Sequence, residues 1–514
     1  MELSLEIKHI SKRFGAVQAN EDISFRLEDG EVLAILGENG AGKTTMMRMI
    51  YGLEAMDSGS IEVNGTPAAI ESPKDAIRLG IGMVHQHFML VNHFTVTQNM
   101  MLGLREHVTE RLNLREQNRR IQKIFDDYGF SMDPNMRVGE LPIGLQQRVE
   151  IMKALFKGAQ LLVLDEPTAV LTPMEIEELF QIIRQLTAQG KSVIFISHKL
   201  DEVMEISDRV LVLRQGRVVG ERATKETSKE ELIRMMIGRA LCPMEKDRPD
   251  SAMRRYPVLK VDKLCVKGER GKRICDISFE VYNHEILGVA GVDGNGQNEL
   301  VEAITGLYRA ESGHVYLNGE EVTNQPPRKV RAHRLSHIPE DRHARGLILS
   351  MDLTDNSILV SHGEPPFSRH GILKQRQAAA FTRGLIDSYQ ISTQSERTKA
   401  ADLSGGNQQK VVVARELSLN PELLVAVKPT RGVDIGATEY IHQCILKERQ
   451  KGKGVLLVSA ELDEVMSLSD RIIVLFNGEM TGCVYADQVT QDELGAMMTG
   501  VSRDFSALSP AWEE

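Results

Sequence analysis

The stretch that decides the fold is residues 37–45, which run Gly37-Glu38-Asn39-Gly40-Ala41-Gly42-Lys43-Thr44-Thr45. It fits the P-loop pattern Gly-x-x-x-x-Gly-Lys-Ser/Thr. An apolar segment at 32–36 precedes it, and a helix-like segment at 45–51 follows it. Glycines let backbone N–H groups close around a phosphate chain, and the start of the helix adds a positive dipole. The stretch therefore predicts a strand, a nucleotide-binding loop formed by all nine residues, and a helix, rather than a chance glycine turn before Lys-Thr.

Two carboxylates are expected beside this loop. The apolar run 161–164 ends in Asp165 and Glu166, and ligands bind at the carboxyl ends of parallel strands. We expect Lys43 to reach the outer phosphates and Thr44 to hold Mg²⁺ together with Asp165. Glu166 is then placed to polarise the water that attacks the last phosphate. The alternative is a pair of solvated acids at a strand end.

Three further side chains are candidates for the same site. His198 follows the apolar strand 192–196, and Gln86 ends a similar strand. We expect His198 to contact the terminal phosphate and Gln86 to contact Mg²⁺ or the water, although a structural histidine and a solvated glutamine remain open. Phe14, in Lys12-Arg13-Phe14-Gly15, is a candidate to stack on the adenine, with ordinary strand packing as the alternative.

The chain repeats itself. Asp22-Ile-Ser-Phe25 recurs 254 positions later as Asp276-Ile-Ser-Phe279, and the glycines of residues 37–42 recur at 291–296 with the same offset. Later pairs, such as Ser-Asp-Arg at 207–209 and 469–471, are 262 positions apart. The chain therefore consists of two homologous halves, and the second half carries its extra residues between the glycine loop and its Pro-Thr motif.

Each half has the same order of expected elements: an amphipathic strand region, the glycine loop, a mainly helical middle (about 95–158 and 352–420), and buried strands. Continuous apolar strands alternating with helices predict an α/β fold with a mostly parallel sheet in each half. We expect a first domain at 1–240, a polar, proline-containing linker at 241–257, a second domain at 258–504 and a tail at 505–514.

Composition excludes several classes of protein. The net charge of −10 argues against a nucleic-acid partner. No run of 18 apolar residues is present, and the acidic, alternating N-terminus is not typical of a signal peptide. Five cysteines without metal-ligand spacing indicate reduced thiols in a cytosolic protein.

A family resemblance follows from a second motif. Leu403-Ser404-Gly405-Gly406-Asn407-Gln408-Gln409-Lys410 resembles the signature sequence of ATP-binding-cassette (ABC) proteins. Together with the P-loop and its partner residues, the resemblance covers nearly the whole chain, twice. A fused double cassette of this length resembles the ATPase subunits of bacterial ribose, galactose and nucleoside importers. The stretches 83–90, 164–173 and 338–342 point to the nucleoside branch.

The resemblance implies an antiparallel β part and a helical subdomain in each cassette. It also implies that two cassettes pack head to tail, with each ATP between the P-loop of one and the signature of the other. On this basis Ser404, Gly405 and Gly406, with the acidic Asp434, are expected to complete the nucleotide site that begins at residues 37–45.

The second half has lost the chemistry of its own loop. Its differences from the first half fall at the cation, the Mg²⁺ ligands, the base, the phosphate-sensing residue and the candidate for adenine stacking. In that comparison Lys43 becomes Gln297, Thr44 Asn298, Gln86 Glu340, Asp165 Val427, Glu166 Lys428, His198 Ala460 and Phe14 Gly268. Its signature is intact, however.

The first half shows the reverse defect, because its signature contains Pro142 and Ile143 and its equivalent of Asp434 is Thr172. Pro142 removes a backbone donor, and Ile143 is bulky where a glycine would let the phosphate approach. The losses therefore sort into one complete composite site and one degenerate site.

We therefore expect the energy subunit of a bacterial importer for nucleosides or simple sugars, which hydrolyses ATP with Mg²⁺. The resemblance implies two transmembrane permease subunits, docked on the helical middles at about 88–140 and 342–402, and an extracytoplasmic substrate-binding protein. The chain would then lie at the cytoplasmic face of the membrane as a peripheral protein.

Two other classes compete with this interpretation. A soluble double-cassette ATPase acting on the ribosome or DNA would usually have two working sites and a long charged linker or basic arm, unlike this chain. A non-hydrolysing regulatory scaffold is disfavoured by the intact catalytic set of the first half.

Overall fold

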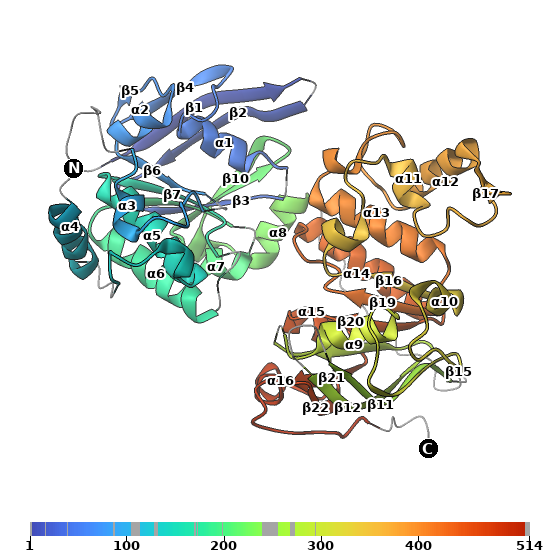
Figure 1. Ribbon diagram of the computed structural model, residues 1–514. Helices are drawn as coiled ribbons and strands as arrows, with labels where there is room; N and C mark the ends of the chain where they lie inside the picture. Colours follow the sequence, from blue (N-terminus) through green and yellow to red (C-terminus); the bar gives the residue numbers. More distant parts are fainter. Residues whose placement is uncertain are drawn as a thin grey trace. The chain divides into compact units, whose positions relative to one another are not determined.

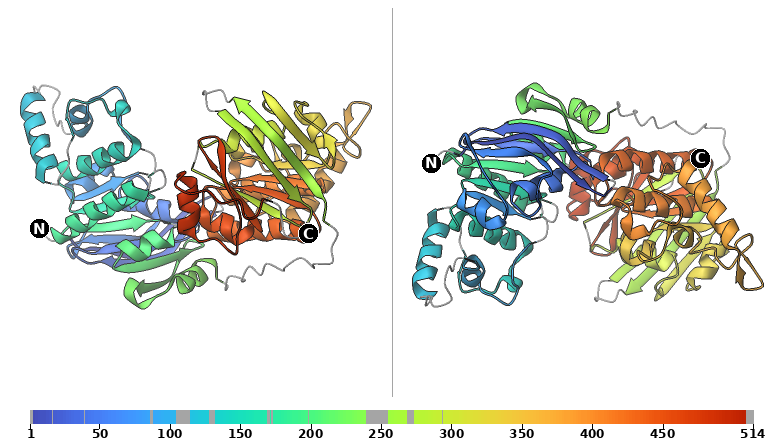
Figure 2. Two further views of the ribbon diagram at one scale, coloured as in Figure 1. Left: turned by 90° about the horizontal axis from the view of Figure 1, so that it is seen from below. Right: turned by 90° about the horizontal axis from the view of Figure 1, so that it is seen from above.

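The computed structural model describes all residues except 1–2, 16, 39, 86–87, 104–113, 128–131, 169–170, 172, 198, 239–254, 268–272, 293 and 509–514. The chain divides into two compact units, Met1–Leu241 and Cys242–Glu514. In Figure 1 the first runs from blue to green and the second from yellow-green to red. Figure 2 gives two further views of both units.

The first unit is built on a six-stranded sheet in the order β10-β9-β3-β8-β7-β6. Its strands are β3 (Val32–Leu36), β6 (Ile81–Val84), β7 (Leu161–Asp165), β8 (Ser192–Ile196), β9 (Arg209–Arg214) and β10 (Arg217–Ala223). All neighbours pair in parallel except β9 and β10. Every residue of β3, β7 and β8 is buried, as expected for parallel strands covered on both faces. The predicted α/β class is confirmed.

A second, antiparallel sheet of the first unit has the order β2-β1-β4-β5. Its strands are β1 (Leu5–Phe14), β2 (Val17–Leu27), β4 (Ser58–Val63) and β5 (Thr66–Pro67). Helix α1 (Lys43–Ile50) joins the two sheets, because its fully buried Met46 and Met47 share one core with Ile7 of β1 and Ile35 of β3. This packing fixes the loop at 37–42 to both sheets.

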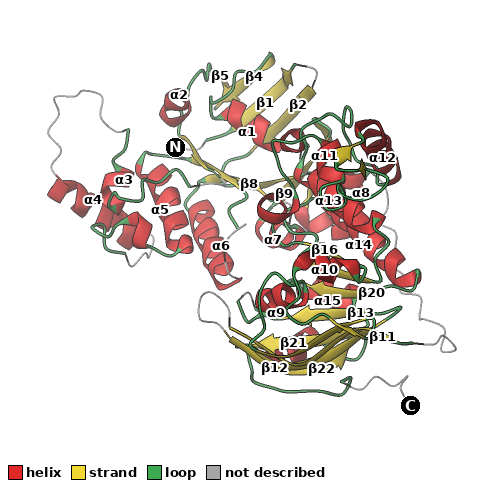
Figure 3. Cartoon of the chain, turned by 45° about the vertical axis from the view of Figure 1, so that its right-hand side comes forward, coloured by secondary structure: helices red, strands yellow, loops and turns green. Residues whose placement is uncertain are grey.

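The remaining helices of the first unit include the helical middle that the sequence predicts. Figure 3 shows α3, α4 and α5 as helices to one side of the strands. The elements are α2 (Pro73–Arg78), α3 (Val96–Met100), α4 (Leu114–Asp127), the 3₁₀ turn η1 (Val138–Glu140), α5 (Ile143–Phe156), α6 (Pro173–Ala188), α7 (Leu200–Ile206), the 3₁₀ turn η2 (Thr224–Glu226) and α8 (Lys229–Ile237).

The second unit repeats this architecture. Its large sheet has the order β16-β19-β20-β13-β21-β22, its antiparallel sheet the order β12-β11-β14-β15, and β17 pairs with β18. The strands are β11 (Pro257–Lys267), β12 (Arg273–Tyr282), β13 (Ile286–Ala290), β14 (Ser312–Leu317), β15 (Glu320–Glu321), β16 (Leu335–Ile338), β17 (Ser368–Arg369), β18 (Ile372–Leu373), β19 (Leu423–Val427), β20 (Gly454–Val458), β21 (Arg471–Phe476) and β22 (Glu479–Tyr485).

The helices of the second unit follow the same order along the chain. They are α9 (Gln297–Ile304), α10 (Pro327–Ala332), the π-helical turn η3 (Arg342–Gly346), α11 (Leu353–Ser357), α12 (Gln375–Ser388), the 3₁₀ turn η4 (Ala400–Asp402), α13 (Gly405–Ser418), α14 (Ile435–Gln450), α15 (Leu462–Leu468) and α16 (Gln491–Met498). Among the helices that the structure describes, none has the length and apolar character needed to cross a membrane.

The first part of the expected tail packs into the second unit. Ala507 is fully buried, and its backbone N–H donates to the carbonyl oxygen of Cys483 on β22. Its own carbonyl accepts a hydrogen bond from the Arg471 guanidinium at 2.9 Å. Residues up to 508 therefore belong structurally to the second unit.

Candidate nucleotide-binding site

The loop at 37–42 leaves β3 and turns directly into α1. Lys43, the first residue of α1, is 6% exposed, and its ammonium donates to the carbonyl oxygens of Gly37 (2.6 Å) and Glu38 (3.0 Å). The lysine thus holds the loop curled around its own side chain. Gly42 has φ of +97°, and a Cβ there would lie 2.3 Å from the Ala19 carbonyl oxygen, so only glycine fits.

The predicted metal ligands meet at the end of β7. The Thr44 hydroxyl hydrogen-bonds to the Asp165 carboxylate, which is 5% exposed. Burial, and secondly the charge of Glu166, raises the pKa of Asp165 to about 6, against the opposing effects of Lys43 and Thr44. The carboxylates of Asp165 and Glu166 and the ammonium of Lys43 together carry a net negative charge at the end of β7. Such a donor set fits a hard divalent cation with oxygen ligands.

Glu166 follows Asp165 in a left-handed backbone conformation, with φ of +46°. Its N–H donates to the carbonyl of Ile196, the last residue of β8, at 3.0 Å. Lys428 in the second unit repeats this geometry, with φ of +43° and an N–H bond to the Val458 carbonyl at 2.7 Å. A left-handed turn directly after the strand is therefore part of both units.

Several predicted residues lie outside the described part of the chain: Asn39, Gln86, Thr172 and His198. Their roles stay predictions. The strands that lead to Gln86 and His198 are β6 and β8, which flank β7 on its two sides. The sheet order is thus the one that the prediction for these two residues requires.

Phe14 is the last residue of β1 and is 46% exposed. The Lys12 ammonium lies 5.3 Å from the centroid of its ring. The ring is not packed in a core, so the alternative of ordinary strand packing loses support. Its stacking on adenine stays a prediction.

Four of the replaced residues in the described part of the second unit occupy the same places in the fold as their counterparts in the first. Gln297 and Asn298 begin α9, as Lys43 and Thr44 begin α1. Val427 ends β19 and Lys428 follows it. The alignment of the two halves therefore matches equivalent structural positions.

The signature residues of the second unit lie together at the start of two helices. Ser404 caps α13 through a hydrogen bond from the Asn407 N–H, and Asp434 caps α14 through one from the Ala437 N–H at 2.8 Å. A Cβ on Gly406 would lie 3.0 Å from a carboxylate oxygen of Asp434. The structure thus brings Ser404, Gly406 and Asp434 to one place within this unit.

The first unit has a different start to its corresponding helix. Pro142 is the N-cap of α5 and makes no side-chain capping bond, whereas Ser404 makes one. Ile143 is 50% exposed in the first turn. The missing capping bond at Pro142 and the exposed Ile143 distinguish the start of α5 from the start of α13, where the sequence also differs.

Sequence reasoning missed the role of Arg342, which it quoted only as part of the stretch 338–342. The Arg342 guanidinium donates to the carbonyl oxygens of Arg431 (2.9 Å) and Gly432 (3.3 Å). One of its nitrogens would lie 2.8 Å from a Cβ on Gly405. Arg342 therefore ties the loop that leads to Asp434 to the start of α13, and no local sequence signal announces this contact.

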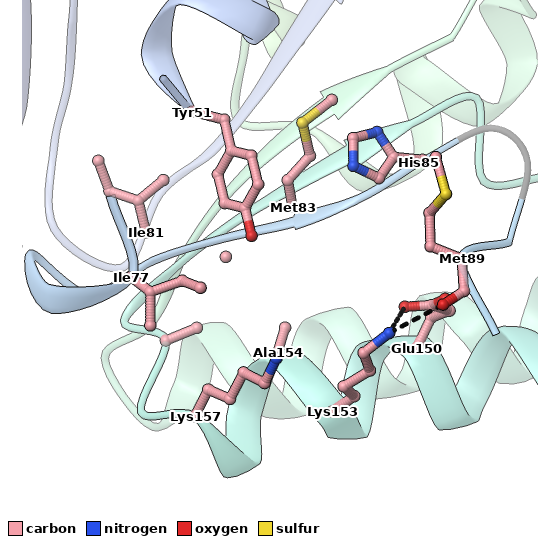
Figure 4. A pocket seen from close by; sticks show the side chains of 12 residues that line it. Tyr51, Ile77, Ile81, Met83, His85, Met89, Glu150, Lys153, Ala154 and Lys157 are labelled. Atoms are coloured by element: carbon pink, nitrogen blue, oxygen red, sulfur yellow. Dashed lines mark hydrogen bonds and ion pairs between the residues drawn. The ribbon is translucent and has the colours of Figure 1, made fainter. Parts of the chain in front are cut away.

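Sequence reasoning also missed a cavity of about 160 Å³ in the first unit, shown in Figure 4. Tyr51, His85 and Met89 line it from one side, and Glu150 and Lys153 of α5 from the other. Glu150 is 6% exposed and pairs with Lys153 at 3.4 Å, while its second oxygen has no hydrogen-bond partner among the described residues. The cavity therefore offers an acceptor in a half-apolar setting.

The fold and the site define a protein with two units of the P-loop class, the first of which brings Lys43, Thr44 and Asp165 together. A family model described as "ABC transporter" matches residues 20–169 and 274–431. The chain belongs to this family: it is an ABC transporter ATP-binding protein with two cassettes, an ATPase coupled to transport.

Relatives of known name match along nearly the whole chain. The nucleoside import ATP-binding protein NupA of Lactococcus lactis subsp. cremoris is 43% identical and covers 97% of this chain and 98% of its own. The guanosine import ATP-binding protein NupO of Bacillus subtilis is 44% identical, with the same two coverages. The ribose import ATP-binding protein RbsA of B. subtilis is 35% identical and covers 97% of this chain and 100% of its own.

Proposed function

We propose that this chain hydrolyses ATP to drive the import of nucleosides, with simple sugars as the second substrate class. The observation that carries this proposal is the full-length similarity to two proteins named for nucleoside and guanosine import, at 43% and 44% identity. The ribose relative is more distant, at 35%. Uptake of labelled nucleosides against pentoses, in cells lacking this gene, tests the choice. Loss of pentose uptake alone would refute the nucleoside assignment.

The chemistry is assigned to the first unit. Backbone N–H groups of residues 37–42 and the Lys43 ammonium bind the ATP phosphates, and Glu166 polarises the attacking water. Thr44, Asp165 and Gln86 would hold Mg²⁺, which supplies positive charge to the phosphate oxygens when bound. His198 contacts the terminal phosphate, and Phe14 stacks on the base.

We further propose that only one nucleotide site hydrolyses ATP efficiently. It pairs the complete loop of the first unit with Ser404, Gly405, Gly406 and Asp434 of the second. The support is the residue complement: the opposite combination lacks the Lys and Thr that follow the glycine loop and the Asp and Glu at the strand end, and it carries Pro142 in its signature.

The one-site proposal is tested in the purified transporter complex by two measurements. Glu166→Gln should lower ATP turnover by roughly 10²- to 10⁴-fold, whereas the matched exposed variant Glu177→Gln should leave it unchanged. Vanadate should trap one ADP per chain. Two trapped ADP per chain, or about half of the turnover left in Glu166→Gln, would contradict the proposal.

The partners are two transmembrane permease subunits, which would keep the chain as a peripheral protein at the cytoplasmic face of the membrane. An extracytoplasmic binding protein would deliver the solute. The permease would dock on the helical segments 88–140 and 342–402. The cavity at Tyr51 and Glu150 borders the first of these segments at Met89 and supports this surface, because a buried carboxylate oxygen without a described partner suits a donor side chain of a permease loop.

Docking is tested by co-purification of the permease with the ATPase. Glu150→Arg should reduce the recovered permease while ATP binding by the isolated chain persists. Glu177→Arg, on the exposed face of α6, is the matched control. Equal recovery with both variants would remove this cavity from the docking surface.

A further inference from the structure

The second unit has a large polar cavity where the first unit has its catalytic residues. The cavity has a volume of about 880 Å³ and extends from Gly294 and Gln297 at the glycine loop. Asn298 of α9, Glu340 after β16 and Lys428 after β19 line its wall. The space beside this loop is therefore open and is not filled by the replacing side chains.

Three polar groups in and beside this cavity converge on one carboxylate. The Lys428 ammonium lies 2.9 Å from Glu340 Oε1, and the Arg431 guanidinium lies 2.5 Å from the same oxygen. The Asn298 amide donates to the second oxygen at 3.1 Å. Lys428 is only 14% exposed, so its charge is weakly screened by water. One carboxylate thus faces two cations, so the cluster of Glu340, Lys428 and Arg431 carries a net positive charge.

The first unit has the opposite balance at the equivalent point, with Lys43 facing Asp165 and Glu166. A polyphosphate would meet repulsion there unless a divalent cation intervened. In the second unit a lysine stands where the first unit has its catalytic glutamate. The wall of its cavity carries four cationic side chains, Arg331, Arg345, Arg415 and Lys428, against four carboxylates, Glu299, Glu302, Glu340 and Glu416.

We propose that the second unit binds a nucleoside triphosphate without a divalent cation, with Lys428 and Arg431 as its fixed counter-charges. This inference rests on the proposed function, in which both units descend from nucleotide-binding cassettes. Glu340 is the internal competitor: its carboxylate holds both cations in the absence of nucleotide, and the outer phosphates displace it. Gln297 adds no charge, since its amide donates back to the Val292 carbonyl at 3.2 Å.

The test is isothermal titration calorimetry of the full chain with ATP, in EDTA and in Mg²⁺. In EDTA we expect one ATP per chain. Lys428→Ala should weaken this binding by at least about tenfold, because a charged hydrogen bond is lost. Lys428→Arg should retain it and shows that the fold is intact. Glu340→Gln should strengthen it by several fold, because the competing carboxylate is gone.

Further titrations identify the ligand and show whether a negative result refutes this inference or the proposed function. ADP, AMP and tripolyphosphate in EDTA distinguish a nucleotide site from a general polyphosphate site, and tripolyphosphate binding as tight as ATP would overturn the nucleotide assignment. In Mg²⁺ a further ATP should bind and be lost in Lys43→Ala. No binding in EDTA, or EDTA binding that Lys428→Ala leaves intact, would overturn the inference alone. If the unsubstituted chain binds no further ATP in Mg²⁺, or if Lys43→Ala leaves that ATP bound, the proposed function is overturned.

Discussion

The second unit contains a buried ion pair whose disruption should destabilise that unit strongly. Glu285 is fully buried and Arg471 is 2% exposed, and they pair through N–O distances of 2.6 and 3.2 Å. Burial raises the pKa of Glu285, against the opposing effect of Arg471. Replacing Arg471 by methionine leaves a buried carboxylate without its partner. Breaking such a pair costs about 3–5 kcal/mol.

The first unit offers a matched control at equivalent positions. Arg209 and Glu31 also pair, with an N–O distance of 2.9 Å, but they are 25% and 12% exposed. Water can reach the Glu31 carboxylate after the substitution, so Arg209→Met should cost only roughly 1 kcal/mol. Both variants replace an arginine that pairs with a glutamate, and they differ in burial and in further contacts: Arg209 also pairs with Glu221, and Arg471 also donates to the Ala507 carbonyl.

Hydrogen–deuterium exchange of the full chain, followed by mass spectrometry, reports each unit separately. Arg471→Met should lower the opening free energy of β21 by about 3–5 kcal/mol, and Arg209→Met should lower that of β9 by about a quarter as much. The double variant Arg471→Met/Glu285→Met should recover most of the loss, since an apolar pair replaces the charges. Equal losses from the two single variants, or no recovery in the double variant, would refute this reasoning.

Three other outcomes follow from single contacts. Burial lowers the pKa of His337 from 6.5 to about 4, so between these pH values the unfolded chain binds a proton that the folded chain excludes. Stability should therefore fall as pH drops through this window, by at most about 3 kcal/mol, and His337→Met should flatten the dependence in urea titrations. Arg342→Gln should speed hydrogen exchange in residues 428–434 and lower ATP turnover roughly 10- to 100-fold. Unchanged exchange would contradict the role of Arg342 in tying the loop that leads to Asp434 to α13. Gly42→Ala should abolish ATP binding because its Cβ meets the Ala19 carbonyl, whereas Gly40→Ala, with open space around its Cβ, should cost about 1–2 kcal/mol of backbone strain, as thermal shift with ATP would show.

The elements that position the first site follow from local patterns. The apolar runs at 32–36 and 161–164 become β3 and β7 almost residue for residue, because five consecutive buried positions between polar residues fit only a strand covered on both faces. The meeting of Thr44 and Asp165 also follows from sequence, since parallel strands end at one edge.

Long-range side-chain contacts could not be predicted in this way. Arg342 reaches Arg431 across 89 positions, and Glu150 borders a cavity with Tyr51 from a separate helix. These contacts depend on how helices pack against strands, and no periodicity in one segment specifies its partner in another. The motif that carries Arg342 is visible in the sequence, but its target is not.

The register of the sheet changes the interpretation of the second unit. Ile338 of β16 pairs with Ala426 of β19, so Glu340 and Lys428, each two residues further on, reach the same edge and meet. Sequence alignment alone treats each as the loss of a catalytic group. In the structure the two changes compensate each other, because Lys428 without Glu340 would be a partly buried cation with one fewer counter-charge.

The compensating pair of Glu340 and Lys428 also indicates that the site in the second unit was changed to another use and did not merely lose its catalytic residues. In the first unit Val84 pairs with Leu164, and the residues two positions further along the sequence, Gln86 and Glu166, are a neutral amide and an acid. In the second unit the same two positions carry an acid and a base. An ammonium at position 428 cannot take a proton from water as a carboxylate does, but it can hold a phosphate oxygen. A loop that keeps its glycines and an open cavity, and that exchanges its base for a cation, is suited to retain a nucleotide and unsuited to cleave it.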